Sequence, residues 1–177
     1  MTKSPKANTP LTIIINIIFE RKRDMRDFEK ISFEQFKKDI KDDSQLYSEY
    51  PLPARSSSKT AGYDIYLLED VTLAPNEIKK IPTGLKARYE DDEVLLLVVR
   101  SGMGFKYNIR LCNQVGVIDA DYYNNPNNEG HMWAKVQNEG DQTVTIKKGE
   151  AIVQGIFMKY LVTDSDNNKH KDRVGKY

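Results

Sequence analysis

Apolar and polar residues alternate along the larger, second part of the chain. Residues 63–67 alternate with a period of two, Leu95 to Val99 form an unbroken apolar run, and residues 143–146 alternate again. Such patterns are typical of short strands, and the Gly, Pro and Asn residues between them are typical of turns. Helical spacing is absent from Ala61 onward. The pattern therefore predicts an all-β fold, either a sandwich or a barrel.

A helical pattern precedes the strands. Ser32 followed three residues later by Gln35 is a capping-box signature for the start of a helix. The apolar residues that follow fall on one helical face, so a short amphipathic helix is predicted over residues 32–41. A substrate lid or a partner-binding helix is one interpretation, but packing on the edge of the domain is favoured. The residues on the apolar face are Phe33, Phe36 and Ile40.

Residues 1–24 are predicted to be an extension outside the fold. Their apolar run, Leu11 to Phe19, is as long as the core of a secretory signal, but Asn16 interrupts it and charged residues follow in place of a cleavage site. The run is also too short to span a bilayer. We hypothesise that Met25 is the natural start of the protein, and the alternative is that the extension adds an edge strand.

Composition and charge exclude several classes of protein. The chain has 177 residues, 39% hydrophobic and 30% charged, which suits one domain with an appendage and predicts no membrane partner. A net charge of +1 gives no reason to expect nucleic acid as a partner. Cys112 is the single cysteine and His131 and His170 are the only histidines, so no disulfide or metal-ligand spacing exists. A cytoplasmic location is predicted, with Cys112 as a small buried residue rather than a nucleophile.

The segment Asn113 to Tyr123 carries the candidate chemistry. A buried-strand pattern is followed by two carboxylates and two tyrosines where the chain should turn back. Gly116 would let another group approach the backbone closely, and Asp119 ends an apolar run, where desolvation would raise its basicity. This is the layout of a small-ligand pocket with one general base. Asp121 is the competing base, and a β-hairpin with acidic turn residues is the alternative for the whole segment.

Three further motifs flank this segment, and the four occur in a fixed order. They are Ala61 to Ile65, Arg100 to Gly104, the Asn113 to Tyr123 segment, and Gly149 to Gln154. Together they resemble the trimeric dUTP diphosphatases (dUTPases) over residues 51–177. The resemblance implies an all-β, jelly-roll-like β-barrel with a short N-terminal helix, assembled as a homotrimer with its sites at subunit interfaces. The predicted organisation is an extension (1–24), a helical segment (25–50), the barrel (51–163) and a shortened flexible C-terminal arm (164–177).

The resemblance implies hydrolysis of dUTP to dUMP and pyrophosphate, which limits uracil incorporation into DNA and supplies dUMP for dTMP synthesis. Asp119 is implied to hold the water that attacks the α-phosphate in line. Mg²⁺ is the implied cofactor, held by triphosphate oxygens and water, with no direct protein ligand. Asp64 is implied to order the metal region indirectly, through water, and a buried structural carboxylate is its alternative interpretation.

The triphosphate is implied to bind Arg100, Ser101 and Gly102, with help from Gln154. The sequence of this motif supplies a guanidinium fork, a hydroxyl and glycine-flanked backbone N–H groups, all of which suit a phosphate. Ala151 stands where the family usually has an arginine, so any role of that arginine is missing here.

Base and sugar are implied to be recognised by the central motif. Uracil pairs with the backbone of its hairpin, around Gly116, Val117 and Ile118, while the side chain of Asn113 adds a contact. The ring of Tyr122 is implied to pack under the deoxyribose and to leave no room for a 2′-hydroxyl. Ordinary core packing is the alternative interpretation of Tyr122, and both can hold at once.

The predicted arm departs from the family pattern. Arg173 and Tyr177 reproduce its arginine and its aromatic residue, but Lys176 replaces its second glycine and no Gly-Ser-Thr-Gly segment follows. If Arg173 reaches the γ-phosphate and Tyr177 stacks on uracil, the shortened arm should lower turnover without abolishing it. The alternative is a frayed polar tail.

Two rival functions compete with dUTP hydrolysis. Deoxycytidine triphosphate deaminases share the implied fold, but Lys135 stands where they need a catalytic glutamate and Lys106 where an arginine is expected. A catalytically weak nucleotide-sensing or protein-binding module is favoured by the shortened arm and the extra helix. The intact Asp119 opposes that reading. Residues 124–130, after the central motif, are predicted to be a solvated surface loop.

Overall fold

The computed structural model describes residues 26–166. The predictions for residues 1–24, with a start at Met25, and for Arg173 and Tyr177 lie outside this range. Within it, no helix is long and apolar enough to cross a membrane. The strands are β1 (Asp27–Lys30), β2 (Tyr63–Tyr66), β3 (Val71–Leu73), β4 (Ile78–Pro82), β5 (Leu85–Arg88), β6 (Glu93–Val99), β7 (Ile109–Leu111), β8 (Gly116–Asp119), β9 (Trp133–Asn138), β10 (Val144–Ile146) and β11 (Ala151–Lys159). The helices are α2 (Phe33–Asp39), α3 (Ser44–Glu49), α4 (Ser101–Tyr107) and the 3₁₀-helix η1 (Ala120–Tyr122).

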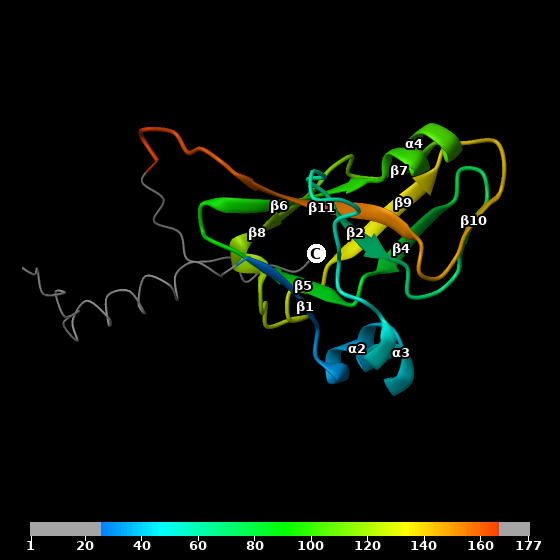
Figure 1. Cartoon of the computed structure of the whole chain (residues 1–177), viewed down its shortest axis with the longest axis horizontal. Coiled ribbons are helices and arrows are strands. Elements are labelled where there is room, and N and C mark those ends of the chain that lie inside the picture. The colour runs from blue at the N-terminus through cyan, green and yellow to red at the C-terminus, as the bar shows by residue number, and fades with distance from the viewer. Residues whose placement is uncertain (1–25, 167–177) are drawn as a thin grey trace, which may run out of the picture.

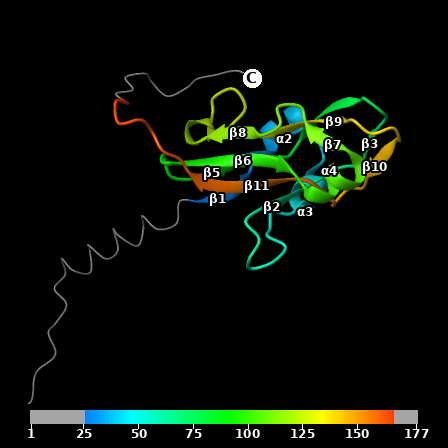
Figure 2. The same cartoon turned by 90° about the horizontal axis from the view of Figure 1, so that it is seen from above.

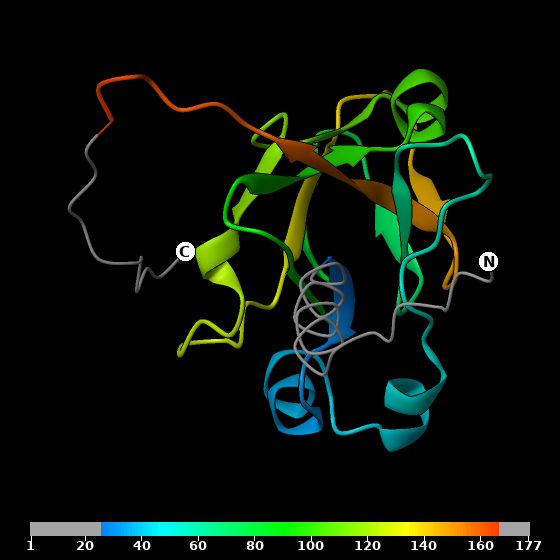
Figure 3. The same ribbon diagram turned by 60° about the vertical axis from the view of Figure 1, so that its left-hand side comes forward.

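The strands pair in antiparallel fashion around one core (Figure 1). The largest sheet has the order β2-β11-β6-β8 and a second sheet has the order β4-β9-β7, while β1-β5 and β3-β10 are two-stranded ladders. Figure 3 shows the strands surrounding the core, with α2 and α3 at one end and α4 at the other. The arrangement confirms the predicted all-β, jelly-roll-like β-barrel.

Strand β6 shows how the apolar pattern builds the core. Leu95 and Leu97 are fully buried, and the residues between them are half-buried, because successive side chains point to opposite faces of the sheet. Burying one leucine side chain contributes about 2 kcal/mol. Strand β11 lies beside β6 along its whole length, and residues 160–166 then continue away from the barrel (Figure 2). The strand predicted from the Leu95 to Val99 run is therefore confirmed.

The predicted N-terminal helix is also confirmed. The Ser32 hydroxyl accepts a hydrogen bond from the backbone N–H of Gln35 at 3.1 Å, so Ser32 is the N-cap of α2. Phe36 is fully buried, and its ring stacks on that of Tyr50 with centroids 5.6 Å apart. Helix α2 therefore packs on the end of the barrel and shares its core, as the favoured interpretation expected.

Three elements were not anticipated by the pattern. Strand β1 lies in the segment predicted to be helical and pairs with β5, which buries Phe28. Helix α4 and the 3₁₀-helix η1 both lie after Ala61, where no helix was expected. Helix α4 contains two glycines, so its only helical signal is Met103 and Tyr107, four residues apart, which pack against the core.

Candidate active site

The central segment contributes one strand, β8, which diverges from β7, the strand just before the segment. Strand β7 ends at Leu111 and β8 begins at Gly116, with a turn between them in which the backbone N–H of Gln114 donates to the carbonyl of Leu111 at 3.0 Å. Within the described residues, β7 pairs with β9 while β8 pairs with β6 in the other sheet. The predicted hairpin is therefore not a paired one, because its two strands belong to different sheets.

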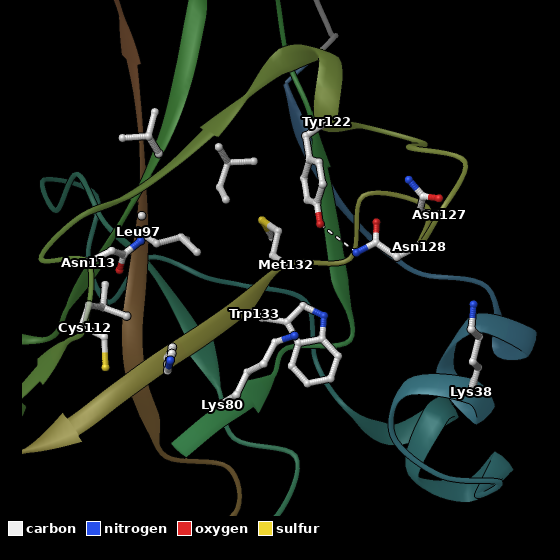
Figure 4. Close-up of a pocket in the computed structure, with 15 residues that line it drawn as sticks. Lys38, Lys80, Leu97, Cys112, Asn113, Tyr122, Asn127, Asn128, Met132 and Trp133 are labelled. Carbon is white, nitrogen blue, oxygen red and sulfur yellow. Dashed lines mark hydrogen bonds between the residues drawn. The ribbon is translucent and has the colours of Figure 1, made fainter. Parts of the chain in front are cut away.

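A cavity of about 670 Å³ lies between these strands and the outer side of β9 (Figure 4). This volume is in the range of small-molecule sites. The five residues predicted to contact base and sugar all line it: Asn113, Gly116, Val117, Ile118 and Tyr122. The close approach at Gly116 comes from the protein itself, because an added Cβ would lie 3.1 Å from Cβ of Leu97. The glycine lets β8 pack closely on β6, so the predicted close approach to its backbone is confirmed, and the approaching group is the Leu97 side chain.

Asp119 is the last residue of β8 and lies directly before η1. It is half-buried, and the preceding residue is held by a side chain from the residue directly after β5. The hydroxyl of the buried Tyr89 donates to the carbonyl of Ile118 at 2.6 Å. Asp121, the competing base, lies on η1 and is exposed. The candidate base therefore lies at the end of a strand, directly before the turn formed by η1, as the apolar pattern predicted.

The ring of Tyr122 is buried and points into the cavity (Figure 4). Its hydroxyl donates to the carbonyl of His131 at 3.1 Å and accepts a hydrogen bond from the side-chain amide of Asn128 at 2.8 Å. Residues 124–130 were predicted to be a solvated surface loop, but Asn125 is only 4% exposed and Asn128 lines the cavity. The loop is thus part of the site's wall. The prediction of a solvated loop is correct for Asn124, Pro126 and Asn127, which are exposed, and wrong for the buried Asn125.

The other three motifs meet elsewhere, at the far end of β6. The Nε of Arg100 lies 3.0 Å from Oδ1 of Asp64, and Gln154 is the cross-strand partner of Asp64 in the β2–β11 ladder. Gly62 leaves room for the Gln154 side chain, since an added Cβ would lie 1.9 Å from its Oε1. Ser101, next in the chain, begins α4. The structure therefore brings Asp64, Arg100 and Gln154 together into one cluster, with Ser101 next to Arg100 in the chain.

The two clusters are far apart within one chain. Asp119 lies opposite Val94, near the start of β6, in the β6–β8 ladder. Arg100 is six residues after Val94 and directly follows the other end of β6. At about 3.3 Å per residue this separation is roughly 20 Å, longer than an arginine side chain extends. A single chain therefore does not bring its own Asp119 and Arg100 to one reacting phosphate.

Metal-binding side chains do not cluster in the described residues. Residues 26–166 hold no group of three or more His, Cys, Asp or Glu that could bind a metal ion. The carboxylate of Asp64 is already paired with the guanidinium of Arg100, which is 41% exposed.

Several residues that line the cavity belong to none of the four motifs. Lys38 reaches the cavity from α2, and Lys80 lies over the ring of Trp133 with its Nζ 4.2 Å from the ring centroid (Figure 4). Alternation along β9 could have placed Trp133 and Lys135 on the outer face, because Ala134 and Val136 between them are buried. No pattern could have shown that α2 lies beside this face.

His131 connects the cavity wall to α2. Its ring is fully buried, Nδ1 lies 2.6 Å from Oδ2 of Asp39, and Nε2 accepts a hydrogen bond from the backbone N–H of Gly84 at 3.0 Å. An acceptor Nε2 requires a neutral ring with its proton on Nδ1. Burial lowers the pKa of His131, and Asp39 opposes this only in part. The folded protein therefore holds His131 neutral.

Acidification should destabilise the fold through His131. Because its folded pKa is below the unfolded value of about 6.5, the unfolded chain takes up the proton first, so this stability is complete above about pH 6.5 and falls below it. Urea unfolding at several pH values between about 7.5 and 5.5 measures the slope. His131→Gln should show a shallower slope, whereas parallel slopes for the two proteins would contradict the assignment.

Known proteins resemble the chain over the region that contains the four motifs. A family model described as dUTPase matches residues 48–176. The deoxyuridine 5′-triphosphate nucleotidohydrolase of Lactococcus lactis is 53% identical over 127 residues, which cover 71% of this chain and 85% of that protein. The protein of the same name from Aeromonas salmonicida is 38% identical over 141 residues, which cover 75% and 89%.

Solved structures agree with these relatives. The crystal structure of dUTPase from Streptococcus mutans superposes with a TM-score of 0.64 at 44% identity, covering 79% of this chain and 100% of that one. A dUTPase of Staphylococcus bacteriophage 80alpha, solved with dUpNHpp, superposes with a TM-score of 0.61 at 20% identity, covering 86% and 93%, and supports the fold alone. The chain therefore belongs to the dUTPase family.

Proposed function

We propose that Asp119 activates the water in the reaction of this chain, the hydrolysis of dUTP to dUMP and pyrophosphate. The observation that supports this is the position of Asp119 between Ile118 and Tyr122, both of which line the cavity that holds the five nucleoside contacts predicted from the central motif. A carboxylate there would take a proton from a water attacking the α-phosphate in line with the leaving pyrophosphate. The reaction removes dUTP from the pool for DNA synthesis and yields dUMP for dTMP synthesis.

The divergence of β7 and β8 supports main-chain recognition of uracil. The cavity lies between the two strands, so a flat base would face the backbone of Gly116, Val117 and Ile118 on one side and Asn113 on the other. The ring of Tyr122 then lies under the deoxyribose, where a 2′-hydroxyl would collide with it. Sugar selection would thus come from a buried ring with a fixed position.

The Arg100 cluster supports a role in binding the triphosphate. Asp64 pairs with the Nε of Arg100, which leaves the two terminal guanidinium nitrogens to face phosphate oxygens. Ser101, the N–H of Gly102 and the amide of Gln154 add neutral donors beside it. Mg²⁺ bound by the triphosphate oxygens would neutralise charge on them, and Asp64 would face its water shell. Arg173 and Tyr177 stay predictions, as does a cytoplasmic location.

Separation of the two clusters supports a site shared between copies of the chain. The roughly 20 Å along β6 is too long for one nucleotide's reacting phosphate to meet both clusters of one chain. A ring of identical subunits solves this, because each chain can offer its nucleoside cavity to one neighbour and its Arg100 cluster to another. We infer the homotrimer of the family, with its sites at the subunit interfaces.

Mixing two inactive variants tests the shared site. Asp119→Asn damages the nucleoside half and Arg100→Ala the phosphate half, so each variant alone should release little pyrophosphate. When equal amounts are refolded together, roughly a quarter of the sites should draw both halves from native sequence and regain turnover. The control mixes Asp119→Asn with Tyr122→Ala, which damage the same half and leave no intact site. Recovery in neither mixture, or in both, would contradict the arrangement.

One assay separates this function from its rivals. The protein is incubated with Mg²⁺ and dUTP, dCTP or dTTP, and pyrophosphate and ammonia are followed. Pyrophosphate from dUTP alone is the expected result. Ammonia from dCTP would indicate a deaminase, which the position of Lys135 on the cavity wall opposes. Nucleotide binding without either product would indicate a sensing module.

A further inference from the structure

The hydroxyl of Tyr122 is held by two partners from one loop. The side-chain Nδ2 of Asn128 lies 2.8 Å from this hydroxyl and 3.2 Å from the carbonyl oxygen of His131, which also accepts the Tyr122 proton at 3.1 Å. The Oδ1 of Asn128 accepts a hydrogen bond from the backbone N–H of Gly130 at 3.1 Å, so its amide orientation is fixed. Figure 4 shows the Asn128 amide at the far end of the Tyr122 ring.

We propose that Asn128 is a positioning residue for sugar selection, which holds the Tyr122 ring in the orientation that excludes a 2′-hydroxyl. This inference rests on the proposed role of Tyr122. A tyrosine ring is attached through two rotatable bonds, so a contact at its far end limits its movement more than a contact near the backbone does. An unrestrained ring could swing away from the sugar and make room for one more oxygen atom.

Helix α2 supports the loop that carries Asn128. Asp39, near the end of α2, contacts the buried His131 ring, and the backbone N–H of Ser32, its N-cap, donates to Oε2 of Glu129 at 2.9 Å. Both ends of the helix are therefore tied to the segment between Asn128 and His131. Contacts therefore run continuously from α2 through the loop to the Tyr122 ring. Through them, the extra helix supports the position of this ring in the site.

The size of the effect follows from one neutral hydrogen bond. Such a bond contributes about 1 kcal/mol, which corresponds to roughly a fivefold change in a rate ratio. Asn128→Asp keeps the shape and the acceptor for Gly130 but removes the donor to Tyr122. The ratio of kcat/KM for dUTP to that for UTP should fall about fivefold, mainly because UTP becomes a better substrate.

Two comparisons separate positioning from a general loss of structure. Asn124→Asp makes the same chemical change in the same loop, where the side chain accepts from Lys86 at 2.8 Å, and should leave the ratio unchanged. Tyr122→Phe removes the hydroxyl itself and should lower the ratio by a similar factor. Adding Asn128→Asp to Tyr122→Phe should then lower the ratio no further, since both changes remove the hydrogen bond between these two side chains.

The outcomes distinguish this inference from the proposed function. If native protein releases no pyrophosphate from dUTP, the proposed function fails and the comparison has no baseline. If native protein is active and Asn128→Asp lowers the rates with dUTP and UTP equally, or adds fully to Tyr122→Phe, the positioning role is overturned. Should Asn128→Asp fail to fold, an unchanged ratio in Tyr122→Phe overturns it equally well.

Discussion

Replacing Asp119 by asparagine should lower the turnover of dUTP by roughly 10³-fold, because general-base assistance and the positioning of the water are lost together. The amide is nearly the same size as the carboxylate but cannot take up a proton at neutral pH. The cavity walls around it come from other residues, so the nucleoside should still bind. Pyrophosphate release at saturating Mg–dUTP measures the loss of turnover, and titration calorimetry with a non-hydrolysable analogue measures the retained affinity.

Asp121→Asn is the matched control for this change. It removes the same charge two residues away, on the exposed side of η1, and should alter turnover by only a small factor. A larger loss in Asp121→Asn than in Asp119→Asn would reverse the assignment of the base. Near-native turnover in Asp119→Asn would remove the carboxylate from the mechanism altogether.

Replacing Phe36 by alanine should destabilise the whole fold by about 4 kcal/mol, as expected when a buried aromatic ring is removed and leaves a cavity. The ring is fully buried and contacts the rings of Tyr47 and Tyr50, with centroids 5.3 Å and 5.6 Å away. Tyr50 in turn donates its hydroxyl to the carbonyl of Gly84, at the start of β5. Urea unfolding followed by tryptophan fluorescence, which reports on Trp133 in β9, measures the change.

Phe33→Ala provides the comparison on the same helix. Phe33 is half-buried at the edge of the same aromatic cluster. Its truncation should therefore lower the free energy of unfolding clearly less than truncation of Phe36 does. If Phe36→Ala unfolded only α2 and left the transition of Trp133 unchanged, the helix would be an appendage rather than part of the core. If both variants lost the same free energy of unfolding, burial of the ring would not determine its contribution to stability.

The parts of the fold that sequence could predict are those whose signals are local. The Ser32 cap and the apolar face behind it define α2 to within two residues at either end, because capping and periodicity act within one helix. The Leu95 to Val99 run gave β6 for the same reason. Strand β1 was missed because four residues are too short for a period to be recognised, and its stability comes from pairing with β5.

The site was predicted in its residues but not in its geometry. The motifs located Asp119, Tyr122, Arg100 and Gln154, yet no local pattern says that β7 and β8 pair with different strands, or that β6 separates Asp119 from Arg100. Asn128 lies in a polar stretch that is typical of an exposed loop. Its contact with Tyr122 depends on how that stretch folds back, which is a tertiary property.

Helix α4 has a consequence for how the site orders itself. None of its seven residues is buried, two of them are glycines, and Phe105 is 93% exposed, so this helix has little intrinsic stability of its own. Segments of this kind open at a much smaller free energy than the barrel around them. The segment that we propose to meet the triphosphate is thus attached to the barrel mainly through Met103 and Tyr107, and a bound anion would stabilise it further.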